Sequence, residues 1–304
     1  MIKRIVFSDI DGTIYGFPEK QLMPETKEDV LNAIELDGVQ LVLTTGNPLL
    51  PKLIKLANEL QSNYLICAGG ALIYDIASHK ILDFHSIPSD VVKKTAEIVN
   101  NKNVATFMYG KDNYYLLNGN EKVHNFFDEF FEYSDWVTDN DNYLTEPIGK
   151  IEIYANNPKV QNKIYKELQA KLDNCNLLYL STHLEITPIG ISKGSGLLKV
   201  CEILDADPKY VMSIGDGEND CAMFEVSGFS YAMDNANNTV KQASKYYTSD
   251  VLQNGFGEAI KDYIHRTKID LIKQENEIKR EKWLAKERRN EFYKKLAENN
   301  QNKE

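Results

Sequence analysis

The N-terminal part of the chain alternates between short apolar runs and segments with helical spacing. The apolar, β-branched run from Ile2 to Phe7 predicts a strand. The segment Pro24–Leu36 predicts a helix, because Val30, Leu31 and Ile34 repeat at helical spacing. The alternation continues with a predicted strand at Val39–Leu43, a helix around Leu53–Leu60 and a strand at Tyr64–Cys67. This spacing predicts right-handed βαβ units on a parallel sheet, whose ligands bind at the C-terminal ends of the strands.

The pattern changes at about Phe84. Aromatic side chains become dense between Phe107 and Trp136, and no short glycine-containing loop follows a strand in this region. The elements predicted here are a half-buried alternating strand at Lys150–Tyr154, an amphipathic helix at Val160–Leu172 and one or two strands within Leu177–Ile186. We therefore predict that residues 84–189 form a separate α/β unit inserted into the first domain.

The alternation of strand and helix resumes after this insertion. Lys193–Leu204 predicts a helix, Tyr210–Ile214 predicts a strand, and a glycine-rich acidic loop at 215–220 follows that strand. The predicted fold class is therefore α/β. A Rossmann-like parallel-sheet core is expected from residues 1–83 and 190–265, together with the inserted α/β unit and a C-terminal helical tail at 266–304.

The tail is highly charged and contains neither glycine nor proline, which predicts a helix. One heptad position is apolar, with residues seven apart: Ile264, Leu271, Ile278, Ala285 and Phe292. The second heptad position that a coiled coil needs is polar, with Gln274, Glu281 and Arg288. That seam is too weak to predict a coiled coil. Two interpretations remain open, an extended helix docked on the body and a solvated tail.

The distribution of charge narrows the classes of function. The 304 residues carry a net charge of −10, and 42% of them are hydrophobic, which is too apolar for a disordered chain. Residues 266–304 hold twelve Lys or Arg and eight Asp or Glu, so 23 Lys or Arg and 37 Asp or Glu remain, a net charge of −14 on residues 1–265. We therefore expect no nucleic-acid partner for the body.

Two further features predict where the protein works. The four cysteines lie far apart without a CxxC pair, so neither a zinc site nor a disulfide framework is expected. No stretch approaches the roughly 18 consecutive apolar residues of a membrane helix, and the N-terminus lacks the features of a signal peptide. We expect a cytoplasmic protein without a membrane partner.

The first candidate for chemistry is the pair Asp9 and Asp11, directly after the first predicted strand. The pair does not begin an EF-hand loop. Counted from Asp9, Gly12 falls at position four in place of six, and position twelve is Lys20 in place of a glutamate. Such aspartates often only satisfy backbone donors in a turn. Further motifs in the same chain make a catalytic role the better interpretation.

Taken together, four motifs resemble those of the haloacid dehalogenase-like phosphatases, and within them the Cof-type sugar phosphatases. They are Asp9-Ile-Asp11-Gly-Thr13, Thr44-Thr45-Gly46, Lys193-Gly194 and Gly215-Asp-Gly-Glu-Asn-Asp220. The resemblance also covers the lead-in 181–194 and the run 232–236. It spans residues 1 to about 265, and it implies that the inserted unit is a cap over the strand ends.

The residue types suit phosphate chemistry in their own right. Asp9, Asp216 and a backbone carbonyl at or near Asp11 offer the hard oxygen ligands that Mg²⁺ prefers. Lys193 adds a positive charge that keeps these close carboxylates from raising one another's pKa. The phosphoryl oxygens of a substrate can then accept hydrogen bonds from Thr45, Gly46 and Asn219.

The resemblance implies a role for each acidic residue. Asp9 is expected to be the nucleophile that forms an aspartyl-phosphate, and Asp11 the general acid and then the general base. Asp220 is expected to act through its neighbours, by orienting a metal-bound water or Lys193. Each residue also has a simpler interpretation: Lys193 as a solvated charge, Thr45 and Gly46 as helix-capping residues, and Asn219 as part of a helix first turn.

The chain departs from the family pattern at two places. Asn47 stands where an arginine is frequent, which removes a cation that could hold substrate, and Gly69-Gly70-Ala71 stands where Asn-Gly-Ala is frequent. His183 is expected to have a surface or packing role, and no cap residue can be assigned to substrate.

The leading hypothesis is a Mg²⁺-dependent phosphatase for small cytoplasmic phosphomonoesters, either sugar phosphates or phosphorylated cofactors. A phosphotransferase or mutase with the same aspartyl-phosphate is one alternative. The other is a regulatory binding protein that acts on a protein partner through residues 266–304.

Overall fold

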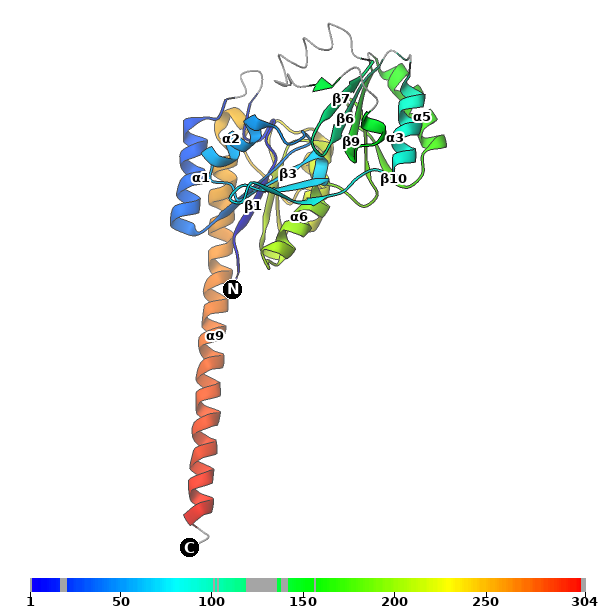
Figure 1. Ribbon diagram of the computed structural model, residues 1–304. Coiled ribbons are helices and arrows are strands. Elements are labelled where there is room, and N and C mark those ends of the chain that lie inside the picture. The colour runs from blue at the N-terminus through cyan, green and yellow to red at the C-terminus, as the bar shows by residue number, and fades with distance from the viewer. Residues whose placement is uncertain are drawn as a thin grey trace.

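Two β-sheets make up the body of the protein, and one long helix extends away from it (Figure 1). The computed structural model describes residues 2–16, 21–100, 102, 104–118, 136–137, 142–155 and 157–301. Much of the aromatic-rich segment between Phe107 and Trp136 lies outside the described residues, and so do the last three residues of the tail.

The larger sheet has eight strands in the order β14-β13-β12-β1-β2-β3-β4-β5. Six of them are parallel: β1 (Ile5–Ser8), β2 (Gln40–Thr44), β3 (Tyr64–Cys67), β12 (Met212–Gly215), β13 (Phe229–Ala232) and β14 (Tyr246–Tyr247). The other two are antiparallel additions at one edge, β4 (Leu72–Asp75) and β5 (Lys80–Phe84). The predicted parallel core is confirmed, whereas β4 and β5 are not among the elements that the pattern predicted.

Helices cover both faces of this sheet because the side chains of each strand alternate between the two faces. In β1, Val6 packs with the helices α1 (Pro24–Asp37), α2 (Pro51–Glu59) and the start of α9, whereas Ile5 and Phe7 pack with α6 (Lys193–Ile203) and α7 (Cys221–Val226). The short helix α8 (Asn238–Ala243) follows β13. The core therefore has three layers, with the polar loops at the carboxyl ends of the strands left uncovered by helices.

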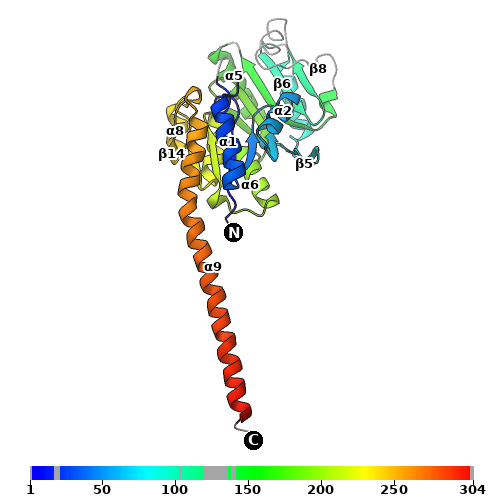
Figure 2. The same ribbon diagram turned by 90° about the vertical axis from the view of Figure 1, so that its left-hand side faces the viewer.

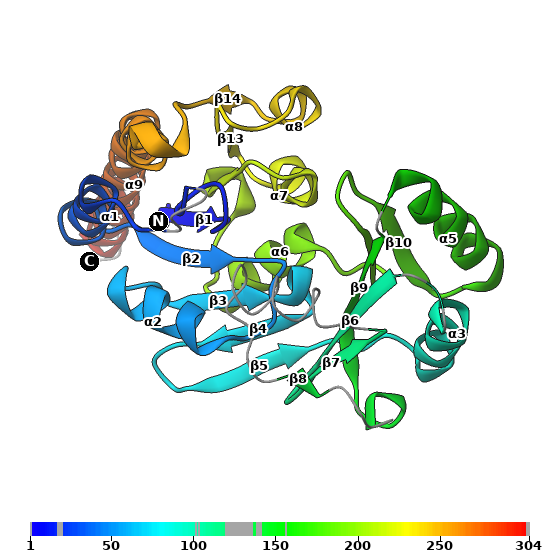
Figure 3. The same cartoon turned by 90° about the horizontal axis from the view of Figure 1, so that it is seen from above.

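The second sheet has six strands in the order β10-β11-β9-β6-β7-β8. Their bounds are Cys175–Tyr179 for β10, Leu184–Pro188 for β11, Ile148–Ala155 for β9, Val104–Gly110 for β6, Tyr114–Leu117 for β7 and Trp136–Val137 for β8. The helices α3 (Ser89–Val99) and α5 (Pro158–Lys171) pack on its outer face, as the view from above shows (Figure 3). This mixed unit is the cap, and its other face is turned towards the core.

One predicted element differs from the observed one in an informative way. The first strand begins at Ile5 and not at Ile2, because the neighbouring strand β2 offers partners only from Gln40 onwards. Of the one or two strands predicted within Leu177–Ile186, the structure has two, β10 and β11, which pair with each other in antiparallel fashion. The predicted strand at Tyr64–Cys67 and the predicted helix from Lys193 are confirmed.

The C-terminal helix α9 spans Gly255–Gln301 and is about 70 Å long at 1.5 Å per residue. Its first turns lie beside α1, where Phe256, Ile260 and Tyr263 are buried in the core (Figure 2). Beyond Gln274 every described side chain is exposed. The helix thus combines both interpretations left open above, a docked start and a solvated remainder. It begins inside the segment predicted as core.

No helix in the described part of the chain combines the length and apolar composition needed to cross a membrane.

Candidate active site

The polar loops after β1, β2 and β12 meet at one edge of the core sheet, opposite the cap. They form the floor of a cavity of about 660 Å³ whose other wall is the inner face of the cap sheet. The predicted site residues that line this cavity are Asp9, Asp11, Thr45, Gly46, Asp216 and Asn219. Parallel strands place their carboxyl ends together, which explains why these residues from distant parts of the chain converge.

Lys193 lies beneath the cavity at the first turn of α6 and is 2% exposed. Its Nζ atom donates to Asp9 Oδ1 and to Asp220 Oδ1, each at 2.6 Å. The helix begins there because two serines form a capping box. The Ser192 side chain accepts a hydrogen bond from the backbone N–H of Ser195, and the Ser195 side chain accepts one from the backbone N–H of Ser192. Lys193 is therefore a buried, ion-paired residue, and the interpretation as a solvated charge is wrong.

The buried carboxylates outnumber the positive charges around them. Burial raises the pKa of Asp9 well above its usual range; Lys193 opposes this rise, and the neighbouring Asp220 and Asp216 add to it. Burial, followed by repulsion from Asp220, raises the pKa of Asp216 to about 7. Although burial lowers the pKa of Lys193, attraction to Asp220 and Asp9 raises it above its ordinary value. Contrary to the prediction from the sequence, Lys193 does not stop these carboxylates from raising one another's pKa, so a further cation would stabilise the cluster.

The ligand atoms in this cluster fit Mg²⁺. Carboxylate oxygens of Asp9, Asp216 and Asp220 lie within 4.8 Å of one another, and all are hard donors. Both Asp220 oxygens are already engaged, since Oδ1 accepts from Lys193 and Oδ2 accepts from the backbone N–H groups of Asp216 and Gly217 at 3.1 and 2.9 Å. Asp9 and Asp216 are therefore the carboxylates best suited to bind the ion, with Asp220 fixing their surroundings.

The loop after β1 approaches Asp216 very closely. Gly12 has φ +89°, and a Cβ atom at this position would lie 2.3 Å from Asp216 Oδ2, so only glycine fits. Asp216 itself accepts hydrogen bonds from Thr13 at 3.4 Å and from Asn235 at 3.2 Å, and Asn235 also donates to Gly12 O at 2.8 Å. Asn235 thus connects the two acidic loops. It was not predicted as a site residue, although the run 232–236 that contains it was part of the resemblance.

The loop after β2 holds the second aspartate of the first motif. Asn47 Nδ2 donates to Asp11 Oδ2 at 3.0 Å, and the backbone N–H of Asn47 donates to Thr45 Oγ1 at 3.1 Å. From the sequence, Asn47 was expected only to remove a cation from the site. In the structure its amide is a contact that orients Asp11.

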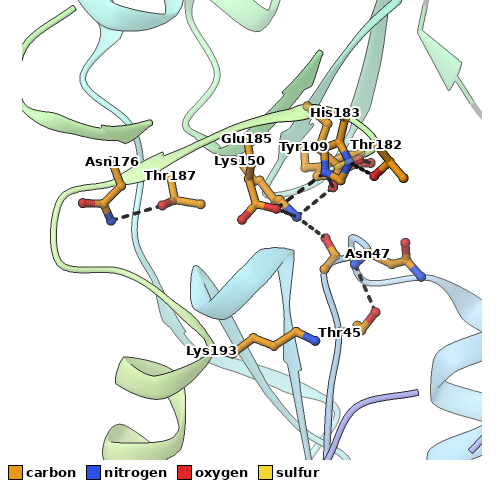
Figure 4. Close-up of polar contacts among 12 residues, drawn as sticks. Thr45, Asn47, Tyr109, Lys150, Asn176, Thr182, His183, Glu185, Thr187 and Lys193 are labelled. Carbon is orange, nitrogen blue, oxygen red and sulfur yellow. Dashed lines mark hydrogen bonds and ion pairs between the residues drawn. The ribbon is translucent and has the colours of Figure 1, made fainter. Parts of the chain in front are cut away.

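The cap contributes a buried charged cluster to the opposite wall (Figure 4). Lys150 Nζ lies 2.7 Å from both Glu152 Oε1 and Glu185 Oε2, and it donates to Gly46 O of the core at 3.2 Å. A Cβ atom at Gly46 would lie 3.1 Å from this ammonium group, so the glycine allows the lysine to approach. His183 lines the cavity beside these residues and stacks on Tyr154, with 4.7 Å between the ring centroids.

All eight predicted site residues thus lie in or directly beneath one cavity. Sequence reasoning missed Asn47, Asn235 and the cap residues Lys150, Glu152, Glu185 and His183. The alternation of the strands does carry a signal for three of the cap residues. Ile151, Ile153 and Ile186 pack against the cap helices. The polar residues that alternate with them therefore belong to the inner face, and these are Lys150, Glu152 and Glu185.

Comparisons with known proteins agree with this geometry. The sequence pattern of the haloacid dehalogenase-like hydrolases matches residues 6–260. The chain is 25% identical over 262 residues to a 5-amino-6-(5-phospho-D-ribitylamino)uracil phosphatase of Bacillus subtilis, covering 86% of this chain and 96% of that protein. It is 24% identical over 261 residues to a phosphoglycolate phosphatase of Methanococcoides burtonii, again covering 86% and 96%. A solved subclass IIB sugar phosphatase has the same fold, with a TM-score of 0.77 at 22% identity over 86% of this chain and 99% of that one.

Proposed function

Because this chain belongs to the haloacid dehalogenase-like hydrolase family, of the Cof type, and is a phosphatase, we propose that it hydrolyses small cytoplasmic phosphomonoesters with the help of Mg²⁺. The proposed substrates are sugar phosphates or phosphorylated cofactors, and the proposed route is an aspartyl-phosphate on Asp9. The cytoplasmic location is a prediction from the sequence.

The buried contact between Lys193, Asp9 and Asp220 is the observation that carries this proposal. A lysine 2.6 Å from two aspartates, with Asp216 close by and a cavity directly above, is far more than a turn or a helix start requires. Strongly perturbed carboxylates in a cleft are typical of catalytic sites.

In the proposed first step, an Asp9 oxygen attacks phosphorus while Asp11 gives a proton to the departing alcohol oxygen. Lys193 favours the ionised, nucleophilic form of Asp9. In the second step Asp11 removes a proton from water, which attacks the acyl-phosphate and releases inorganic phosphate. Thr45 and Asn219 supply donors to the phosphoryl oxygens. Mg²⁺, held by Asp9, Asp216 and a backbone carbonyl near Asp11, would supply neutralisation of the phosphate charge.

The size of the cavity supports a metabolite larger than phosphate itself. Its 660 Å³ lies within the range of about 300–1,000 Å³ typical of small-molecule sites. The named relatives act on a ribitylaminouracil phosphate and on phosphoglycolate, which differ greatly in size and charge. We therefore propose the class of reaction here and treat the leaving group separately below.

Phosphate release by purified protein tests the proposal. Turnover of a panel of phosphorylated metabolites is expected to need Mg²⁺, to stop with EDTA and to be lost in Asp9→Asn and Lys193→Ala, with folding checked by circular dichroism. The hypothesis is wrong if Asp9→Asn retains full activity.

A further inference from the structure

Two glutamates face each other on the cap wall of the cavity. Glu152 on β9 and Glu185 on β11 are direct cross-strand partners, and both are less than one-tenth exposed. Like charges directly opposite each other destabilise a sheet. A pair of this kind in a buried position therefore needs compensation, and Lys150 provides it at 2.7 Å from each carboxylate.

The compensating lysine is already surrounded by three acceptors. An ammonium group has three N–H donors. Lys150 Nζ has ion pairs with Glu152 and Glu185 and donates a hydrogen bond to the Gly46 carbonyl oxygen at 3.2 Å. Binding of a substrate carboxylate to Lys150 would require one of these buried contacts to break.

Both glutamates are ionised at neutral pH. Burial by itself would raise their pKa values, but attraction to Lys150 outweighs it, lowering the pKa of Glu152 and bringing that of Glu185 to about 2. Glu152 Oε2 also accepts hydrogen bonds from the Tyr109 and Tyr154 hydroxyls, at 2.7 and 3.0 Å. Lys150, Glu152 and Glu185 together carry a net charge of −1, and His183 Nε2 lies 3.7 Å from Glu152 Oε1 and 3.8 Å from Glu185 Oε2.

Apart from His183, no basic side chain offsets this charge within the described lining of the cavity. Lys150 is the only Lys or Arg among those lining residues. On the core side the neutral Asn47 contacts Asp11, and Glu218 adds a further negative charge at the rim. The part of the cavity beyond the phosphate site is therefore negative on both walls.

We propose that the Glu152–Glu185 pair selects substrates by the charge of the leaving group. It disfavours phosphomonoesters whose alcohol part carries a carboxylate, and it favours neutral or cationic alcohols rich in hydroxyl or amine donors. This inference rests on the proposed function. Charges in a buried site are poorly screened, so a carboxylate that reaches this wall meets strong repulsion. Of the substrates named for the two relatives, the ribitylamino compound has a leaving group rich in hydroxyl and amine donors, whereas phosphoglycolate carries a carboxylate.

A matched pair of substrates tests the proposal in the unmodified protein. Sorbitol 6-phosphate and 6-phosphogluconate have the same six-carbon chain and differ in a terminal hydroxymethyl or carboxylate group. With Mg²⁺ at pH 8, kcat/KM is expected to be on the order of 100-fold higher for the sorbitol ester, since like-charge contacts in such sites cost several kcal/mol. A ratio near one, or a preference for the gluconate, would overturn the proposal even though phosphatase activity stands. Hydrolysis of neither ester, nor of any other phosphomonoester in the panel, would instead refute the proposed function.

Variants locate the selectivity in the cap. Glu152→Gln removes one charge with little change of shape, and it is expected to reduce the ratio of the two kcat/KM values about tenfold. Glu167→Gln is the matched control, because this partly buried glutamate lies on α5, outside the cavity lining, and pairs with Lys102 and Lys171. If the ratio of the two kcat/KM values is the same in Glu152→Gln as in wild type, the charge of Glu152 does not set the preference between the two esters. If that variant does not fold, Glu185→Gln replaces it, and the wild-type ratio already decides the main point.

Discussion

The contact between Asn47 and Asp11 shows how a neutral side chain can set the position of a proposed catalytic one. Asn47 Nδ2 lies 3.0 Å from Asp11 Oδ2, and the Asn47 backbone is fixed by Thr45 Oγ1. An aspartate that gives and takes a proton must stay within reach of the substrate oxygen and of water. A short amide restrains its carboxyl group without bringing a full positive charge next to it.

Replacing Asn47 by alanine should therefore slow the chemical step. We expect Asn47→Ala to lower kcat about 10–100-fold, as loss of an orienting contact typically does, with a smaller change in KM. Steady-state kinetics with a single good substrate measures both parameters. Asn58→Ala, on the exposed face of α2, serves as the control. Equal kcat values for the two variants would show that Asn47 does not orient Asp11 for the chemical step.

That the proposed catalytic residues of the core lie together was predictable, but their contacts were not. The four motifs identified Asp9, Asp11, Lys193 and Asp216 because each motif is contiguous in the chain. Asn47 and Asn235 act across loops, and their partners depend on backbone positions, such as the φ of +89° at Gly12, that no spacing rule specifies. At the residue scale, the sequence thus indicated which groups gather at the site, but not which side chains hold them in place.

At the scale of elements, the cap wall follows from the alternation of strands β9 and β11. Ile151 and Ile153 point to the cap helices, which leaves Lys150 and Glu152 on the inner face. The alternating strand was predicted, but alternation only separates two faces. Identifying which face meets the core, and that Glu152 stands opposite Glu185, required the observed register. His183, expected to be a surface or packing residue, lines the cavity for the same reason.

The charged cluster on these strands should make the stability of the protein depend on pH. The pKa of Glu185 is lowered from an ordinary 4.5 to about 2, so its stabilising contribution is complete above pH 4.5 and is lost as the pH falls towards 2. A shift of this size corresponds to about 3 kcal/mol of unfolding free energy at neutral pH. Glu185→Gln should be less stable than wild type by about this amount at pH 7.

Urea unfolding between pH 7 and pH 3 measures this dependence. The stability difference between wild type and Glu185→Gln should shrink steadily below about pH 5. Glu202→Gln is the control, because Glu202 is exposed on α6 and pairs only at the surface with Lys199. A difference that is constant over this pH range would argue against an ionised, lysine-bound Glu185.

At the scale of the whole molecule, the cap and the long helix play separate parts. The cap contacts the catalytic loops, for instance through Lys150 and Gly46, whereas the exposed part of α9 points away from the cavity (Figure 1). The tail was predicted to be helical from its lack of glycine and proline. The sequence left docking and solvation of this helix both open, because the buried Phe256 and Tyr263 lie in a segment assigned to the core. A protein partner for residues 266–304 stays a prediction.

Truncation separates the docked and exposed parts of α9. Deletion of residues 275–304 removes only exposed side chains among those described, so kcat/KM and the melting temperature should stay close to wild type. Deletion of residues 260–304 also removes the buried Ile260 and Tyr263, and should prevent stable folding. A tenfold loss of activity in the shorter deletion would mean that the exposed helix contributes to catalysis.

The central claim is that Asp9 carries the phosphoryl group during turnover, and trapping that group is the most direct test. Wild-type protein is mixed with substrate and Mg²⁺, quenched in acid and treated with borohydride, which reduces an acyl-phosphate to an alcohol but leaves free carboxylates intact. Mass spectrometry of the peptide containing residue 9 should find reduction at Asp9, dependent on both substrate and metal. Reduction at another aspartate, or none at all in protein quenched during steady turnover, would contradict the proposed mechanism.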